Sequence, residues 1–134
     1  MKVIIDTGPW SAFFRRDRGP QHIVREVARL IKADEVQLFG PIRQELLSGA
    51  QPQEHFEHLK EYLRFFPNLH LDEQEDELAA EFYNKCRGRG IQGTGTDLLI
   101  CAAAVRHGMR ILTLDRDFDA YATVLSIRLH RPAG

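Results

Sequence analysis

Short apolar runs alternate with longer, partly charged segments along the whole chain. The short runs are typical of buried strands, and they predict strands at residues 3–5, 36–39, 111–114 and 126–129, with a weaker one at 68–71. The longer segments predict helices at residues 7–15, 22–33, 42–47, 54–66, 75–87 and 97–107. This alternation predicts an α/β fold of three layers, with a mainly parallel central sheet, in a single domain of residues 1–134.

The segment at 22–33 illustrates the amphipathic pattern of these helices. Its apolar residues recur three and four positions apart, and charged residues such as Glu26 and Arg29 lie between them. Such a pattern predicts an apolar face on the core and a solvated charged face.

The segment at 97–107 is different, because it is apolar on nearly all sides and is therefore predicted to be buried. Thr96 is a natural N-cap, which places Asp97 in the first helical turn. The helix dipole stabilises an acid there by about 0.3–1 kcal/mol, and this alone explains its presence. An acid held rigidly against the core is also a suitable metal ligand, so both interpretations stay open.

Two further acids follow predicted strands directly. Asp6 comes after the strand at 3–5, and Asp115 comes after the strand at 111–114. Aspartate is common where a strand gives way to a turn, but ligands of open α/β sheets also gather at the carboxyl ends of the strands. Glu45 flanks the apolar stripe of the segment at 42–47, where a solvated helix face is the alternative interpretation.

Carboxylates that converge without a cation repel one another, and one of them then holds a proton. A hard divalent ion removes this conflict. Oxygen ligands without nearby Cys or His favour Mg²⁺ or Mn²⁺ over Zn²⁺. Such an ion lowers the pKa of bound water and neutralises charge on a reacting phosphate, so phosphodiester hydrolysis is the reaction that these acids suit best.

The overall charge excludes a generally basic nucleic-acid binder, because 18 basic and 19 acidic residues leave a net charge of −1. Attraction to phosphates must therefore be local. A basic rim is one interpretation, and scattered surface arginines are the other, for Arg15, Arg16, Arg18, Arg43, Arg87 and Arg89. Trp10, Phe13 and Phe14 could stack on bases, but their spacing favours packing in the core and at a dimer interface.

Two cysteines, Cys86 and Cys101, are too few for a disulfide framework, although one bridge between them is an alternative. The opening residues, MKVIIDTGPW, lack the pattern of a signal peptide. No apolar run reaches the roughly 18 residues needed to cross a bilayer. We expect a cytoplasmic protein that does not bind membranes.

Four segments in order carry a resemblance to a known family: VIIDTGPWSAFFR, PIRQELLSG, TDLLICAAAVRHG and ILTLDRDF. The chain resembles PIN-domain ribonucleases of the VapC toxin type over nearly its whole length. The resemblance places the four family acids on Asp6, Glu45, Asp97 and Asp115. It implies that all four are catalytic and metal-binding, with Asp6 and Asp97 as the main ligands and the other two acting partly through water.

The resemblance also gives Thr7 a role in orienting the first acid. The fourth acid is open at this point, because DRDFD offers Asp115, Asp117 and Asp119. Asp115 is nearest the strand end, and Asp117 could instead cap the following turn.

The resemblance implies an Mg²⁺-dependent endoribonuclease that leaves a 5′-phosphate and a 3′-hydroxyl. It further implies a homodimer and an antitoxin partner whose tail fills the active site. The alternative function is a PIN-like module that binds RNA or a protein without cutting. An aspartyl-phosphate phosphatase is disfavoured, because its DxD motif follows the first strand. His55 and His58 have suitable spacing for a metal but no evident third ligand.

Overall fold

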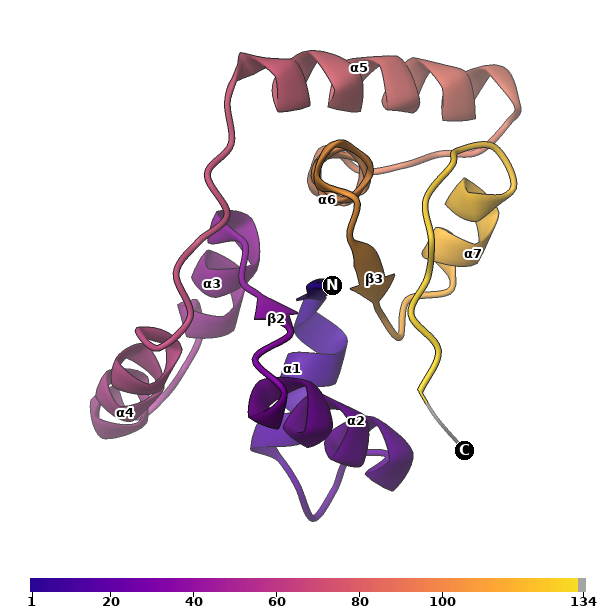
Figure 1. Cartoon of the computed structure of the whole chain (residues 1–134). Coiled ribbons are helices and arrows are strands. Elements are labelled where there is room, and N and C mark those ends of the chain that lie inside the picture. Colours follow the sequence, from indigo (N-terminus) through magenta and orange to yellow (C-terminus); the bar gives the residue numbers. More distant parts are fainter. Residues whose placement is uncertain (133–134) are drawn as a thin grey trace.

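The computed structural model describes residues 1–132 and has a three-stranded parallel sheet at its centre (Figure 1). The strands are β1 (Val3–Ile5), β2 (Val36–Gln37) and β3 (Arg110–Leu112), in the order β2-β1-β3. Val3 pairs with Val36 on one side and with Arg110 on the other. The parallel α/β prediction is confirmed, and the carboxyl ends of β1 and β3 lie side by side.

The two outer strands that the sequence predicted at 68–71 and 126–129 are each reduced to a single bridge. Asn68 pairs with Leu38, and Leu129 pairs with Ile111. The backbone N–H of Leu69 donates to the Leu38 carbonyl, and that of His130 donates to the Ile111 carbonyl. Because each segment meets the sheet at one residue pair, it does not continue as a strand.

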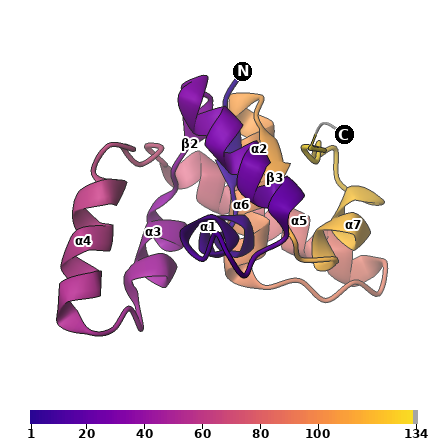
Figure 2. The ribbon, with the colours of Figure 1, turned by 90° about the horizontal axis from the view of Figure 1, so that it is seen from below.

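All six predicted helices are present, and a seventh is added. Their bounds are α1 (Thr7–Phe14), α2 (Gln21–Lys32), α3 (Gly40–Leu47), α4 (Gln53–Leu63), α5 (Glu73–Gly88), α6 (Gly95–His107) and α7 (Asp117–Ala122). Helices α1 and α2 lie on one side of the sheet and α5 and α6 on the other (Figures 1 and 2). This arrangement gives the three predicted layers, with α3 and α4 beside β2.

Helix α6 begins two residues earlier than predicted. Its N-cap is Thr94, whose side-chain oxygen accepts a hydrogen bond from the backbone N–H of Asp97 at 3.1 Å, so the prediction of Thr96 as the cap was wrong. Asp97 nevertheless stays in the first turn, as predicted. The helix ends at Gly108, whose φ of 64° lies in the left-handed region that glycine adopts most easily. Within residues 1–132, no helix combines the length and apolarity needed to cross a bilayer.

The core joins the sheet to the helices on both faces. All of β1 is buried, and Trp10 and Phe13 are only 0% and 5% exposed. The Trp10 ring stacks on Phe14 with 5.7 Å between ring centroids. The predicted core packing of these aromatic residues is thus confirmed, and burial excludes Trp10 from stacking on a base. Cys86 and Cys101 are both buried and free.

Candidate metal centre at the carboxyl end of the sheet

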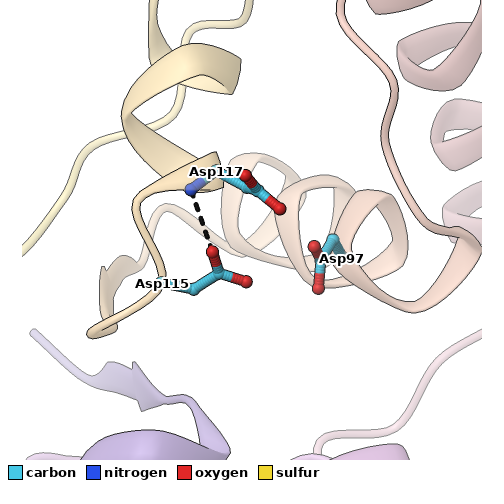
Figure 3. A group of neighbouring side chains, drawn as sticks. All are labelled: Asp97, Asp115 and Asp117. Atoms are coloured by element: carbon cyan, nitrogen blue, oxygen red, sulfur yellow. Dashed lines mark hydrogen bonds between the residues drawn. The ribbon is translucent and has the colours of Figure 1, made fainter.

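Three carboxylates converge beyond the carboxyl end of β3. Asp97, Asp115 and Asp117 each offer an oxygen, and these oxygens lie within 4.8 Å of one another. Figure 3 shows the three side chains directed toward a common space. Asp97 comes from the first turn of α6, Asp115 from the turn after β3 and Asp117 from the first residue of α7. The structure thus brings together acids from two distant parts of the chain.

Local hydrogen bonds fix the turn that carries Asp115. Its backbone N–H donates to Thr113 Oγ1 at 3.0 Å, and its Oδ1 accepts from the backbone N–H of Asp117 at 2.9 Å. This second bond is the dashed line in Figure 3. Asp115 therefore supports the start of α7 with one oxygen, a role that the sequence left open for Asp117, and its other oxygen faces the cluster.

Asp6 is the N-cap of α1, and both of its oxygens are held. Oδ1 accepts from the backbone N–H of Thr7 at 2.9 Å, and Oδ2 accepts from Thr113 Oγ1 at 2.8 Å. Burial raises the pKa of Asp6 above its ordinary value, the two hydrogen bonds oppose this rise, and repulsion from Glu45 and Asp115 adds to it. Thr113 therefore links the first acid directly to the turn of the fourth.

Asp97 is held by a buried phenol. Its Oδ2 accepts a hydrogen bond from the Tyr121 hydroxyl at 2.8 Å. Burial raises the pKa of Asp97, and repulsion from Asp6 and Asp115 adds to this effect against the Tyr121 bond. Burial also raises the pKa of Tyr121, so the hydroxyl stays protonated and acts as the hydrogen-bond donor to Asp97.

Glu45 occupies a different position from the other predicted acids. It lies on α3, is exposed, and lines a hollow together with Thr7. Its charge still reaches Asp6, whose pKa it helps to raise. The structure thus groups Asp97 and Asp115 with Asp117, joins Asp6 to them through hydrogen bonds, and leaves Glu45 at the margin. The metal-binding and catalytic roles of Asp6, Glu45, Asp97 and Asp115 stay predictions.

The donor set fits a hard divalent cation. Within the described residues, no Lys, Arg or His side chain forms an ion pair with Asp6, Asp97, Asp115 or Asp117. The two raised pKa values reflect carboxylates that burial and mutual repulsion leave without a compensating charge. Oxygen ligands of this kind suit Mg²⁺ or Mn²⁺, and hydroxyl groups such as those of Thr113 and Tyr121 orient them.

Sequence reasoning missed Thr113 and Tyr121. A hydroxyl residue two positions before Asp115 is a recognisable turn signal, whereas Tyr121 is separated from its partner Asp97 by 24 residues and has no local signal. The role suggested for Thr7 is performed by its backbone N–H rather than by its hydroxyl.

Arg43 does not belong to a basic rim. Its guanidinium donates to the side chain of Asn68 and to the carbonyl oxygens of Leu63 and Phe66 at the end of α4. Among the other arginines of the predicted rim, the side chains are exposed at Arg15, Arg16, Arg18, Arg87 and Arg89.

Comparison with known proteins gives both a family and a set of solved folds. The PIN domain family matches residues 3–124. The chain is 33% identical over 130 residues to the VapC ribonuclease Mb1587 of Mycobacterium bovis, covering 94% of this chain and 96% of the relative. It has the same identity and coverage with the ribonuclease VapC11 of Mycobacterium tuberculosis.

Two solved complexes contain chains with a similar fold. FitAcB from Neisseria gonorrhoeae aligns with a TM-score of 0.78 and 21% identity, covering 97% of both chains. VapBC-1 from nontypeable Haemophilus influenzae aligns with a TM-score of 0.75 and 17% identity, also covering 97% of both. At these identities the likeness concerns the fold.

Proposed function

The chain belongs to the PIN-domain family, and from this premise we propose that it is a VapC-type ribonuclease toxin that hydrolyses RNA phosphodiester bonds with Mg²⁺, or Mn²⁺, in its acidic centre. The observation that carries the proposal is the convergence of uncompensated carboxylates at the carboxyl end of the parallel sheet. Relatives named ribonucleases, matching over 94% of the chain, support the same activity.

In this proposal Asp6 and Asp97 are the main metal ligands, and Glu45 and Asp115 complete the acidic pocket. Asp117 joins them, because one of its carboxylate oxygens lies within 4.8 Å of oxygens of both Asp97 and Asp115. When bound, the ion would neutralise charge on the phosphate, and it would lower the pKa of water so that hydroxide is available near neutral pH. Thr113 and Tyr121 hold Asp6 and Asp97 in place through their hydroxyl groups.

The partners that we propose are an RNA substrate, an antitoxin protein and a second copy of the chain. Structures of similar fold were solved as VapBC complexes from several bacteria, which supports an antitoxin. Exposed arginines just after α1, in the last turn of α5 and just after α5 supply local positive charge for the RNA backbone despite the net charge of −1. Two free, buried cysteines suit the reducing cytoplasm, where we place this activity.

The test is cleavage of a mixed RNA pool by the purified protein with Mg²⁺ and with EDTA. We expect cleavage with Mg²⁺, none with EDTA, and a loss of about 10³-fold in Asp97→Asn, since a bound ion is worth several kcal/mol to such a reaction. The matched control is Asp17→Asn, an exposed acid in the loop after α1, which should cleave like wild type. Cleavage that survives both EDTA and Asp97→Asn contradicts the mechanism.

Growth on expression separates this function from binding without cutting. Asp6→Asn should relieve growth arrest if hydrolysis is the toxic event. Unchanged arrest, together with retained RNA binding, would instead assign toxicity to binding alone.

A further inference from the structure

A hollow of about 390 Å³ lies between α1, α3 and α4, directly beside the acidic centre. Thr7 and Glu45 form the side of the hollow that faces this centre, because Thr7 follows Asp6 and Glu45 is close enough to raise its pKa. The volume lies within the range of small-molecule sites, roughly 300–1,000 Å³. A ligand in the hollow would therefore be adjacent to any phosphate held by the carboxylates.

The hollow has an apolar floor and a polar rim that includes one arginine. Leu46 and Leu59 contribute side chains that are only 9% and 7% exposed, and the half-buried Phe14 adds an aromatic ring. Arg15 and His55 are exposed on the rim. Their positions combine an apolar surface for a flat ring with a positive edge for a phosphate.

One polar atom in the wall lacks a protein partner. Thr7 Oγ1 is buried and forms no hydrogen bond within the described structure. Because Thr7 Oγ1 is closed off from water, a ligand in the hollow would meet the Ser11 hydroxyl of this wall instead. The Ser11 side chain lies one helical turn further along α1 and lines the same hollow.

We propose that this hollow is a nucleotide subsite that holds one nucleotide of single-stranded RNA next to the scissile phosphate. The base lies on the apolar floor against Phe14, since aromatic rings support bases of any sequence. The neighbouring phosphate meets Arg15 and His55, away from the negative charge of Glu45. A ribose hydroxyl meets the Ser11 hydroxyl, which favours RNA over DNA. The assignment rests on the proposed function, because it names where that substrate lies.

A kinetic experiment tests the subsite with a 12-nucleotide single-stranded RNA of mixed sequence. Two variants disturb the hollow: Arg15→Ala with His55→Ala removes the two polar side chains of the rim, and Ser11→Leu fills the space without changing charge. The matched control, Arg25→Ala with His58→Ala, removes the same residue types at exposed positions outside the hollow and outside the proposed basic rim. We expect KM to rise about tenfold in both hollow variants, with kcat within about twofold of wild type and the control unchanged. Thermal melting of each variant verifies folding.

Binding in EDTA tests the same inference without catalysis. Titration of ¹⁵N-labelled wild type with each of the four ribonucleoside 5′-monophosphates should shift the amide signals of Ser11, Gly49 and His55. The matching deoxynucleotides should shift them less. If wild type fails to cleave RNA but these signals move, the proposed catalysis fails and the subsite stands. If wild type cleaves, KM stays unchanged in both hollow variants and these signals do not move, the subsite is wrong and the function stands.

Discussion

The molecule contains two sets of buried or half-buried carboxylates, one with basic side chains as partners and one without. Glu75, 1% exposed, lies 2.9 Å from Arg106 and 2.8 Å from His107. Glu26, 4% exposed, lies 2.7 Å from Arg29 and 2.6 Å from His130. The pKa of Glu75 is lowered to about 2, and the largest cause is the hydrogen bond from the backbone N–H of Asp72. The pKa of Glu26 is also lowered to about 2, and the largest cause is the hydrogen bond from Arg29.

The acidic centre shows the reverse. Asp6 and Asp97 accept hydrogen bonds from hydroxyl and amide groups, but no cationic side chain within residues 1–132 forms an ion pair with them, and burial raises the pKa of each. The chain thus provides ion-pair partners for Glu26 and Glu75, which connect α2 to the C-terminal segment and α5 to α6, and leaves the carboxylates of the centre uncompensated. We therefore expect a cation from solution to stabilise the second set, as the proposed metal-dependent activity requires.

The largest expected effect concerns Glu75, which belongs to the set with basic partners. Glu75→Ala removes an anion that accepts from Arg106, from His107 and from the N-cap of α5. We expect the free energy of unfolding to fall by about 3 kcal/mol, the lower part of the range for breaking a buried pair, because Arg106 and His107 stay partly solvated. Urea unfolding measures the change. Glu77→Ala, an exposed acid two positions further on α5, serves as the control and should lose less than about 0.5 kcal/mol.

The same comparison marks the limit of what the sequence could predict. Periodicity located six helices, because each has enough residues to repeat a pattern, and short apolar runs located the three strands. Helix α7 was missed, since its six residues hold only one buried pair, Phe118 and Tyr121. Glu26 looked like a solvated position on a charged face, but the chain 104 residues later covers it with His130. Contacts at such a separation leave no local signal.

The sequence located some residues of the candidate site and missed the contacts between distant ones. Strand ends located Asp6 and Asp115, because a strand that stops at an acid is visible in the pattern. The closeness of Asp117 to Asp97 depends on how α7 turns back over α6, and Thr113 meets Asp6 across 107 residues. The N-cap of α6 was misplaced because Thr94 and Thr96 are equally suitable hydroxyl residues two positions apart.

The next largest effect concerns the hydrogen bond that orients Asp97 in the acidic centre. Tyr121→Phe removes the hydroxyl that donates to Asp97 and keeps the ring packed against Phe118, 5.2 Å away between centroids. We expect Mg²⁺ to bind about tenfold more weakly, as when an orienting partner of a ligand is lost. Isothermal titration calorimetry measures the affinity. Tyr83→Phe, on an exposed part of α5, is the control, and equal affinities in both variants would remove Tyr121 from the site.

A smaller effect tests repulsion within the centre. Without metal, Asp97→Asn should raise the free energy of unfolding by about 0.5 kcal/mol, since water screens much of the repulsion at this half-buried position. With Mg²⁺ the wild type should recover or exceed the variant, because a ligand that binds the native state adds stability. Thermal melting with EDTA and with Mg²⁺ measures both changes. Identical Mg²⁺ responses in the two proteins would count against Asp97 as a ligand.

The smallest effect is the pH dependence, in which the two sets of carboxylates act in opposite directions. The raised pKa of Asp6 and Asp97 means that the folded protein binds their protons more tightly than the unfolded chain does. Their contribution to stability therefore grows as the pH falls from neutral through the folded-state pKa, above the ordinary value of 3.8. Glu26 and Glu75 contribute stability above their ordinary value of 4.5, and this is lost as the pH falls toward their folded pKa of about 2.

We therefore expect the metal-free protein to be most stable at mildly acidic pH, with a gain over neutral pH of about 0.3 kcal/mol from the centre. Asp97→Asn should show a smaller gain on this side, because it retains only the contribution of Asp6, and the same fall below pH 4.5 as wild type. The difference between the two proteins removes the titration of groups that they share. Urea unfolding between pH 3 and 7 in EDTA measures this difference. A difference that is constant across the range would mean that the Asp97 carboxylate is not destabilised by its surroundings, and the contrast between the two sets would then rest on Asp6 alone.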